Sequence, residues 1–242
     1  MIELIFKLLL FYILSLAYFY SVTGYGKLIS NKNSNFFELQ LDGTIVLLLI
    51  GYIFYLSIGI NGLLNCIIVF FGFILFFFHK KKNVIVKFNY ILLLFILLFS
   101  VLLISKTHED FNSYHLFSIS ELFNNSLRIG ISKLNMYYMH SSHLTLNQAL
   151  TVFPYLNFKI IHLPIFIIYI SVLGYFLKVA FSNNFRTNEL FFSIFSIFIL
   201  LVKFNRLSEF GYDYISQFIL LVIFHKIYFL NFNKYELRKS IL

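Results

Sequence analysis

The uncharged run over residues 44–78 constrains the fold more than any other feature of the sequence. These 35 residues contain no Asp, Glu, Lys or Arg. A single α-helix of that length would extend about 52 Å, whereas the hydrocarbon core of a bilayer is about 30 Å thick. The segment 59–62, Gly-Ile-Asn-Gly, divides the run. We therefore predict a tight helical hairpin that crosses a membrane twice, with helices over 44–59 and 62–78.

The composition of the whole chain agrees with a membrane location. Of the 242 residues, 60% are hydrophobic and 12% are charged, against about 45–50% and about 25% in soluble domains. A water-soluble globule of this size could not bury so much apolar surface. The single cysteine, Cys66, excludes an intrachain disulfide. Composition therefore excludes a soluble domain, a disordered chain and a disulfide scaffold.

Five further apolar runs bring the prediction to about seven transmembrane helices in a single domain, residues 1–242. A spanning helix needs about 20 apolar residues, with a range of about 17–25. The run 190–202 is the weakest candidate, because it has only 13 residues. The predicted fold is an all-α, polytopic integral membrane protein. The five runs are residues 4–22, 84–105, 160–177, 190–202 and 214–230.

Basic residues predict the orientation of these helices. Three consecutive lysines follow the hairpin within residues 79–87, and loops rich in Lys and Arg stay on the cytoplasmic side. We therefore place 79–87 inside and, by alternation, 106–159 and 203–213 outside. The polar segment 24–43, with its glycines, predicts a turn on the inside. The net charge of +9 thus reflects topology, and nucleic acid is not an expected partner.

The long outer segment, 106–159, still carries apolar residues at helical spacing. Leu116, Ile119 and Phe123 follow the pattern i, i+3, i+7. This pattern is typical of short helices that lie along the membrane surface. We expect an extracytoplasmic loop that contains such surface helices.

Acidic residues are few and concentrate on the predicted outer face. Glu109 and Asp110 come directly after a predicted span, where a carboxylate is partly dehydrated. Desolvation raises the pKa of a carboxylate and makes it a better base. The alternative is a solvated pair that caps the end of the helix. The five outer acids are Glu109, Asp110, Glu121, Glu209 and Asp213.

Cationic side chains share this outer face. Acids and bases together suit a charged, lipid-linked substrate, because cations hold a phosphate and a carboxylate accepts a proton. A surface or interfacial role is the favoured alternative for His79 and His225, and the choice stays open for His140 and His143. The outer cations and histidines are His108, His115, Arg128, Lys133, His140, His143 and Arg206.

Other chemistries fit the sequence less well. His140 and His143 are spaced i, i+3, but neither an HExxH motif nor a cysteine pair supports a zinc site. Ser141 and Ser142 lack the GxSxG motif of a serine nucleophile. No acidic residue falls in the middle of a predicted span, which disfavours a proton-coupled transporter.

Several short motifs resemble the bacterial GT-C-type membrane glycosyltransferases, in particular one poorly characterised branch. Residues 107–116, THEDFNSYHL, are similar to the first large extracytoplasmic loop of those enzymes. Leu-Asn at 134–135 and Ser-Ser at 141–142 match elements that follow in that branch. Residues 206–213, RLSEFGYD, resemble its later Arg-Leu-x-Glu-aromatic-Gly-x-Asp element. The resemblance covers roughly residues 84–213.

The resemblance implies an enzyme of a bacterial inner membrane and cell envelope that uses a sugar donor on a polyprenyl phosphate. A loop carboxylate would activate the acceptor hydroxyl, and Asp110 matches that role best, followed by Glu109. Membrane lipids and the lipid-linked donor are the expected partners. The candidate substrate-binding residues are His115, Arg128, His140, Arg206, Glu209 and Asp213.

The chain also departs from this pattern. Residues 136–140, Met-Tyr-Tyr-Met-His, stand where the branch has an Arg-aromatic-Gly element. GT-C enzymes are usually longer, so we expect either an N-terminal fragment or a diverged copy. No cofactor is expected, and a divalent cation between Asp110 and the phosphate is an alternative that the sequence leaves open.

The alternative from another functional class is a non-catalytic membrane protein, such as a transporter, a flippase-like module or an assembly factor. A transporter should gather polar residues at the bilayer midplane. A GT-C enzyme should gather them at the outer surface. The position of the polar side chains therefore discriminates between the two hypotheses.

Overall fold

The computed structural model describes residues 2–30, 34–78, 92, 94, 96, 98–99, 115–128, 133, 143–156, 158–182, 187–208 and 214–229. Within these residues the fold is all-helical, and no strand occurs among them. The α-helices are α1 (Ile2–Ile29), α2 (Phe36–Ser57), α3 (Gly62–Phe78), α5 (Leu116–Asn124), α6 (His143–Ala149), α7 (Leu163–Ala180), α8 (Thr187–Val202) and α9 (Ile215–Phe229). Two short 3-10 helices, η5 (Phe158–Ile160) and η6 (Phe204–Ser208), complete the described elements.

Three of these helices are long and apolar enough to cross a membrane, by length and composition. They are Ile5–Ile29 of α1, Phe36–Ser57 and Leu163–Ala180. Helices α3, α8 and α9 are apolar but shorter, with 10–17 residues each. The helices indicate a membrane protein, and the full set of seven spans remains a prediction.

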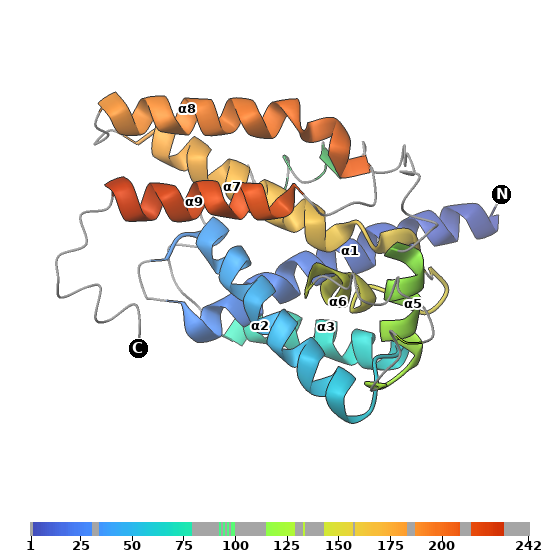
Figure 1. Cartoon of the computed structure of the whole chain (residues 1–242). Helices are drawn as coiled ribbons and strands as arrows, with labels where there is room; N and C mark the ends of the chain where they lie inside the picture. The colour runs from blue at the N-terminus through green and yellow to red at the C-terminus, as the bar shows by residue number, and fades with distance from the viewer. Residues whose placement is uncertain are drawn as a thin grey trace.

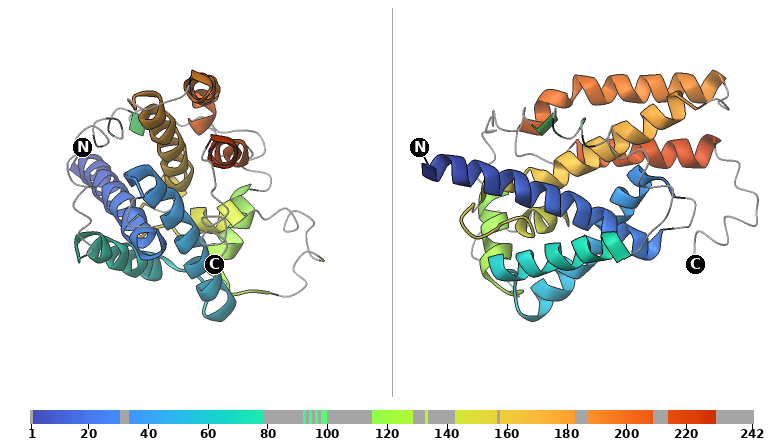
Figure 2. Two further views of the ribbon diagram at one scale, coloured as in Figure 1. Left: turned by 90° about the vertical axis from the view of Figure 1, so that its left-hand side faces the viewer. Right: turned by 180° about the vertical axis from the view of Figure 1, so that it is seen from behind.

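Helix α7 forms the centre of the bundle. Figures 1 and 2 show it between the group α1–α3 and the pair α8–α9, and it packs against α2, α6, α8 and α9. Within the protein, 78% of the α7 span is buried, against 28% for α1 and 39% for α2. A helix that is apolar on all sides is expected at such a position.

The predicted hairpin over residues 44–78 is confirmed at its turn. Helix α2 ends at Ser57 and α3 begins at Gly62. Between them Gly59 adopts a φ of +83°, which glycine accepts without steric cost. Its backbone N–H donates to the carbonyl of Phe54 at 2.8 Å. The Gly-Ile-Asn-Gly segment therefore ends one helix and starts the next.

The turn predicted within residues 24–43 is shorter than expected, and the glycines do not form it. Helix α1 runs to Ile29, and α2 already begins at Phe36. The glycines serve close helix packing instead, because a Cβ on Gly26 would lie 1.7 Å from the Leu39 carbonyl oxygen. Small residues let helices in a membrane approach closely. The expected span 4–22 is accordingly longer than predicted.

The segment predicted to lie outside contains short helices, as expected, but α6 is buried within the protein. Asn147, Gln148 and Ala149 are fully buried, and α6 packs against α2, α5 and α7. Asn65 of α3 donates its amide to the carbonyl oxygens of Ala149 at 2.9 Å and Val152 at 2.8 Å. Ala149 is the last residue of α6 and Val152 lies just beyond it, so these bonds attach the end of α6 to α3.

Helix α5 is amphipathic as predicted. Ile119 is fully buried, whereas Phe117 is 52% exposed. The predicted span 84–105 falls mostly outside the described residues. Its residue Phe99 is buried, with its ring 4.8 Å from that of Phe11 and 6.1 Å from that of Phe166.

Candidate functional site

Five of the eight predicted site residues lie outside the described residues. They include both candidates for the catalytic base. The predicted grouping of these residues at the outer surface therefore stays a prediction. The five residues are Glu109, Asp110, His140, Glu209 and Asp213.

The other three predicted residues lie around α5 and the end of α8. His115 is buried immediately before α5. Arg128 follows α5, where its Nε lies 3.8 Å from Glu121 Oε1 and its guanidinium donates to the Asn125 side chain. Arg206 lies in η6, and its carbonyl accepts from the Tyr214 hydroxyl at 2.5 Å. The Arg128 side chain is therefore held against the end of α5, and the backbone of Arg206 is held by Tyr214.

Buried amides mark the part of the bundle around α6. The side chains of Asn147 and Gln148 are fully buried, and within the described part of the chain neither their oxygens nor their nitrogens have a hydrogen-bond partner. Asn65 Oδ1 also has none among these residues. A buried polar group left unsatisfied costs about 1–3 kcal/mol. We call these three residues the amide cluster, and its chemistry suits a polar ligand with both donors and acceptors.

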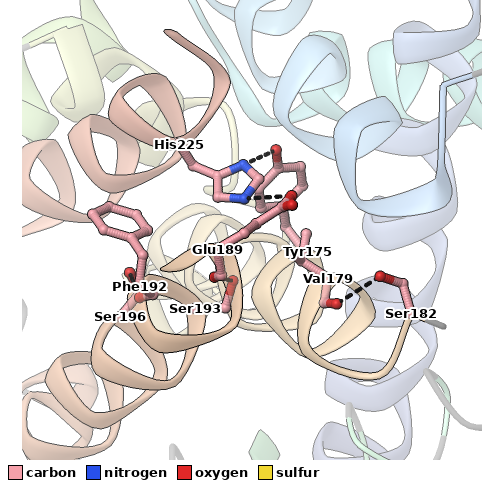
Figure 3. Close-up of polar contacts among 8 residues, drawn as sticks. All are labelled: Tyr175, Val179, Ser182, Glu189, Phe192, Ser193, Ser196 and His225. Carbon is pink, nitrogen blue, oxygen red and sulfur yellow. Dashed lines mark hydrogen bonds and ion pairs between the residues drawn. The ribbon is translucent and has the colours of Figure 1, made fainter. Parts of the chain in front are cut away.

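A second polar site lies at the other end of the bundle, between α7, α8 and α9. Figure 3 shows the two nitrogens of the His225 ring in contact with the side chains of Tyr175 and Glu189. The hydroxyl of Tyr175 lies 2.8 Å from His225 Nδ1. His225 Nε2 lies 3.2 Å from Glu189 Oε1, an electrostatic contact rather than an aligned hydrogen bond. We call these three residues the histidine site.

The interpretation of His225 as a surface residue is wrong. Its side chain is only 1% exposed, because aromatic rings from three helices pack around it. The ring centroids of Phe176, Phe192 and Phe229 lie 5.8, 6.1 and 5.3 Å from that of His225. An imidazole in such a setting needs polar partners, and Tyr175 and Glu189 supply them.

An ion pair joins the same region to α2. Lys226 Nζ lies 2.9 Å from Glu38 Oε1, and both side chains are partly exposed. Glu38 also takes part in a capping box, since its carboxylate accepts from the Asn35 backbone N–H at 2.9 Å. The start of α2 is therefore fixed both to its own cap and to the last turn of α9.

Uncharged polar side chains lie deeper in the bundle. Gln40 of α2 donates to the Thr23 hydroxyl of α1 at 3.4 Å. Its Oε1 lies 2.8 Å from the Ser171 hydroxyl of α7. Ser171 precedes Tyr175 by four residues, so both lie on one face of α7. These hydrogen bonds join α1, α2 and α7 where lipid offers no partner.

The histidine site has little signature in the sequence. Glu189 and His225 are 36 positions apart, and each resembles an ordinary residue near the end of an apolar run. Their relation depends on how α8 packs against α9, which no spacing in the sequence encodes.

Neither a metal site nor a known relative helps to identify the chemistry of the described residues. Among the described residues, no group of three or more His, Cys, Asp or Glu side chains could hold a metal ion. Searches against family models, curated proteins and solved structures find no match to this chain.

Proposed function

We propose that the protein is a membrane glycosyltransferase of GT-C type, which transfers a sugar from a polyprenyl-phosphate donor to an acceptor on the extracytoplasmic face. The motifs around Asp110 and Arg206 motivate this proposal. The observation that carries it is the amide cluster, because the segment that follows Asp110 is folded into the bundle and brings buried amides with it. Amides are suitable partners for sugar hydroxyls, as they both donate and accept.

In this proposal the acidic and the basic residues have different roles. Asp110, with Glu109 as the second candidate, accepts the proton of the acceptor hydroxyl. Arg128, Arg206 and His140 contact phosphate or carboxylate groups. Orientation of the donor and electrostatic stabilisation supply most of the rate enhancement.

The test is sugar transfer from polyprenyl-phosphate donors in membranes that contain the full chain. Asp110→Asn keeps the size of the side chain and removes the base, so transfer should fall by about 10²–10⁴-fold. Asp42→Asn, a change in α2, is the matched control and should transfer at the wild-type rate. Wild-type transfer by Asp110→Asn would remove this residue from the mechanism and leave Glu109 as the next candidate.

A second candidate function is a transport or flippase-like module. It is favoured by the histidine site and by the polar contacts of Gln40, because ionisable and polar side chains inside a bundle mark transport pathways. Vesicles with the reconstituted chain discriminate the two functions. Movement of a lipid-linked sugar phosphate that requires Glu189 and tolerates Asp110→Asn would support transport and contradict the enzyme.

A further inference from the structure

We propose that the histidine site is a buried proton-binding site, in which His225 exchanges a proton with the aqueous side through Glu189 and holds it between α7, α8 and α9. The proposal stands on the geometry of three described helices. It depends neither on the glycosyltransferase proposal nor on the transport alternative.

The partners of the ring determine where its proton lies. An ionised carboxylate only accepts hydrogen bonds, so the nitrogen that faces Glu189, Nε2, keeps the proton of the neutral ring. The opposite nitrogen, Nδ1, then accepts from the Tyr175 hydroxyl at 2.8 Å. The neutral ring is therefore the Nε2–H tautomer.

The same geometry accommodates a second proton. A proton on Nδ1 reverses the contact with Tyr175, since the phenol oxygen also accepts hydrogen bonds. The positive ring then forms an ion pair with Glu189 across the 3.2 Å contact. No helix has to move, because the phenol hydroxyl only rotates. Both protonation states of His225 thus have partners on both sides of the ring.

The charges around His225 favour this uptake. With a neutral ring, Glu38, Lys226 and Glu189 together carry a charge of −1, since the lysine pairs with Glu38. The added proton brings the total to zero. The other neighbours of the ring are uncharged phenylalanines of α7, α8 and α9. Burial disfavours a charged ring, and the Glu189 carboxylate at 3.2 Å opposes part of that cost.

The exposed fractions of the three side chains indicate which residue links His225 to the protein surface. The side chain of Glu189 is 18% exposed, whereas that of His225 is 1% exposed. Tyr175 is also buried. Within the histidine site, Glu189 is therefore the member that reaches the protein surface, in the first turn of α8.

Solid-state NMR of the full chain in lipid bilayers, with ¹⁵N-labelled histidine, tests the proposal. The His225→Gln variant assigns the signals of His225 by difference from the other six histidines. We expect a neutral Nε2–H tautomer at high pH and a doubly protonated ring on acidification. An Nδ1–H tautomer, or a ring that stays neutral down to pH about 5, would overturn the proposal without any variant of the site.

Two substitutions then separate a proton site from a merely structural histidine. Tyr175→Phe should move the Nδ1 signal toward that of a nitrogen without a hydrogen bond, while the ring still takes up its second proton. Glu189→Gln should abolish the doubly protonated ring at the pH where the wild type shows it. Ser196→Ala, two turns along α8 from Glu189, is the control and should leave both signals unchanged. A Glu189→Gln protein that titrates like the wild type would contradict the role of the carboxylate.

Discussion

The two polar regions of the bundle differ in how their buried groups are satisfied. In the histidine site Nδ1 of His225 is hydrogen-bonded to Tyr175, and Nε2 faces the Glu189 carboxylate across a 3.2 Å ionic contact. In the amide cluster Asn147 and Gln148 are as deeply buried, yet their side-chain atoms have no hydrogen-bond partner among the described residues. A buried polar group without a partner costs stability. The first region therefore suits proton exchange, and the second suits a polar ligand.

The response to acid should distinguish the two regions most strongly. His162, directly before the α7 span, lies at the same end of α7 as α6. Burial lowers the pKa of His162 to about 4 from 6.5. Because the folded protein binds this proton less readily than the unfolded chain, His162 contributes stability above pH 6.5. That contribution is lost as the pH falls through about 4, and amounts to about 3 kcal/mol.

Unfolding of the wild type and His162→Gln by a denaturing detergent, at pH 7 and at pH 4, measures this contribution. Glutamine does not titrate, so the variant should lose about 3 kcal/mol less on acidification. If acidification lowers the free energy of unfolding equally in the wild type and in His162→Gln, groups other than His162 cause the loss. The acid response at this end of α7 could then not be assigned to His162.

Removal of an unpartnered amide should stabilise the fold. Gln148→Leu replaces a fully buried polar side chain by an apolar one of similar size. The free energy of unfolding should rise by about 1–3 kcal/mol, while sugar transfer falls if the amide binds the donor. The exposed residue Phe117 of α5 provides the control, since Phe117→Leu should change neither quantity. A destabilised Gln148→Leu protein would show that the amide has a structural partner.

The paired region should respond in the opposite sense. Tyr175→Phe removes the hydroxyl that lies 2.8 Å from His225 Nδ1 and leaves the ring without that partner. Hydrogen bonds between helices in membrane proteins contribute about 0.6 kcal/mol on average and at most about 1.7. We expect a loss within this range in detergent unfolding. Tyr228→Phe on α9 is a matched control, because Tyr228 is 78% exposed.

Features that depend on local chemistry could be predicted from the sequence, whereas those that depend on packing could not. The hairpin turn follows from local chemistry, since Gly59 needs a positive φ that glycine tolerates. The central position of α7 agrees with its uninterrupted apolar run. Gly24 and Gly26 are ambiguous in the sequence, because glycine is equally suited to a turn and to close helix packing. Only the position of the Leu39 carbonyl beside Gly26 decides between the two.

The candidate sites were harder to predict for the same reason. Amphipathic spacing predicts that α5 forms, yet nothing in the spacing places α6 inside the bundle. The amide of Asn65 does so from a helix that is 84 residues away in the sequence. His225 and Glu189 likewise meet only through the packing of α8 on α9. Contacts that depend on tertiary packing leave no periodic pattern in a single sequence.

The smallest expected effect concerns the ion pair at the edge of the histidine site. Lys226 Nζ lies 2.9 Å from Glu38 Oε1, but the two side chains are 38% and 21% exposed. Water therefore screens the attraction, and such pairs contribute about 0.2–1 kcal/mol. Lys226→Met should lower the free energy of unfolding by no more than this, because methionine keeps most of the apolar stem.

The double variant Lys226→Met, Glu38→Gln completes a thermodynamic cycle that isolates the pair. A coupling well above 1 kcal/mol would mean that the pair is shielded from water. The histidine site would then extend to α2, and proton uptake by His225 would be coupled to the start of that helix.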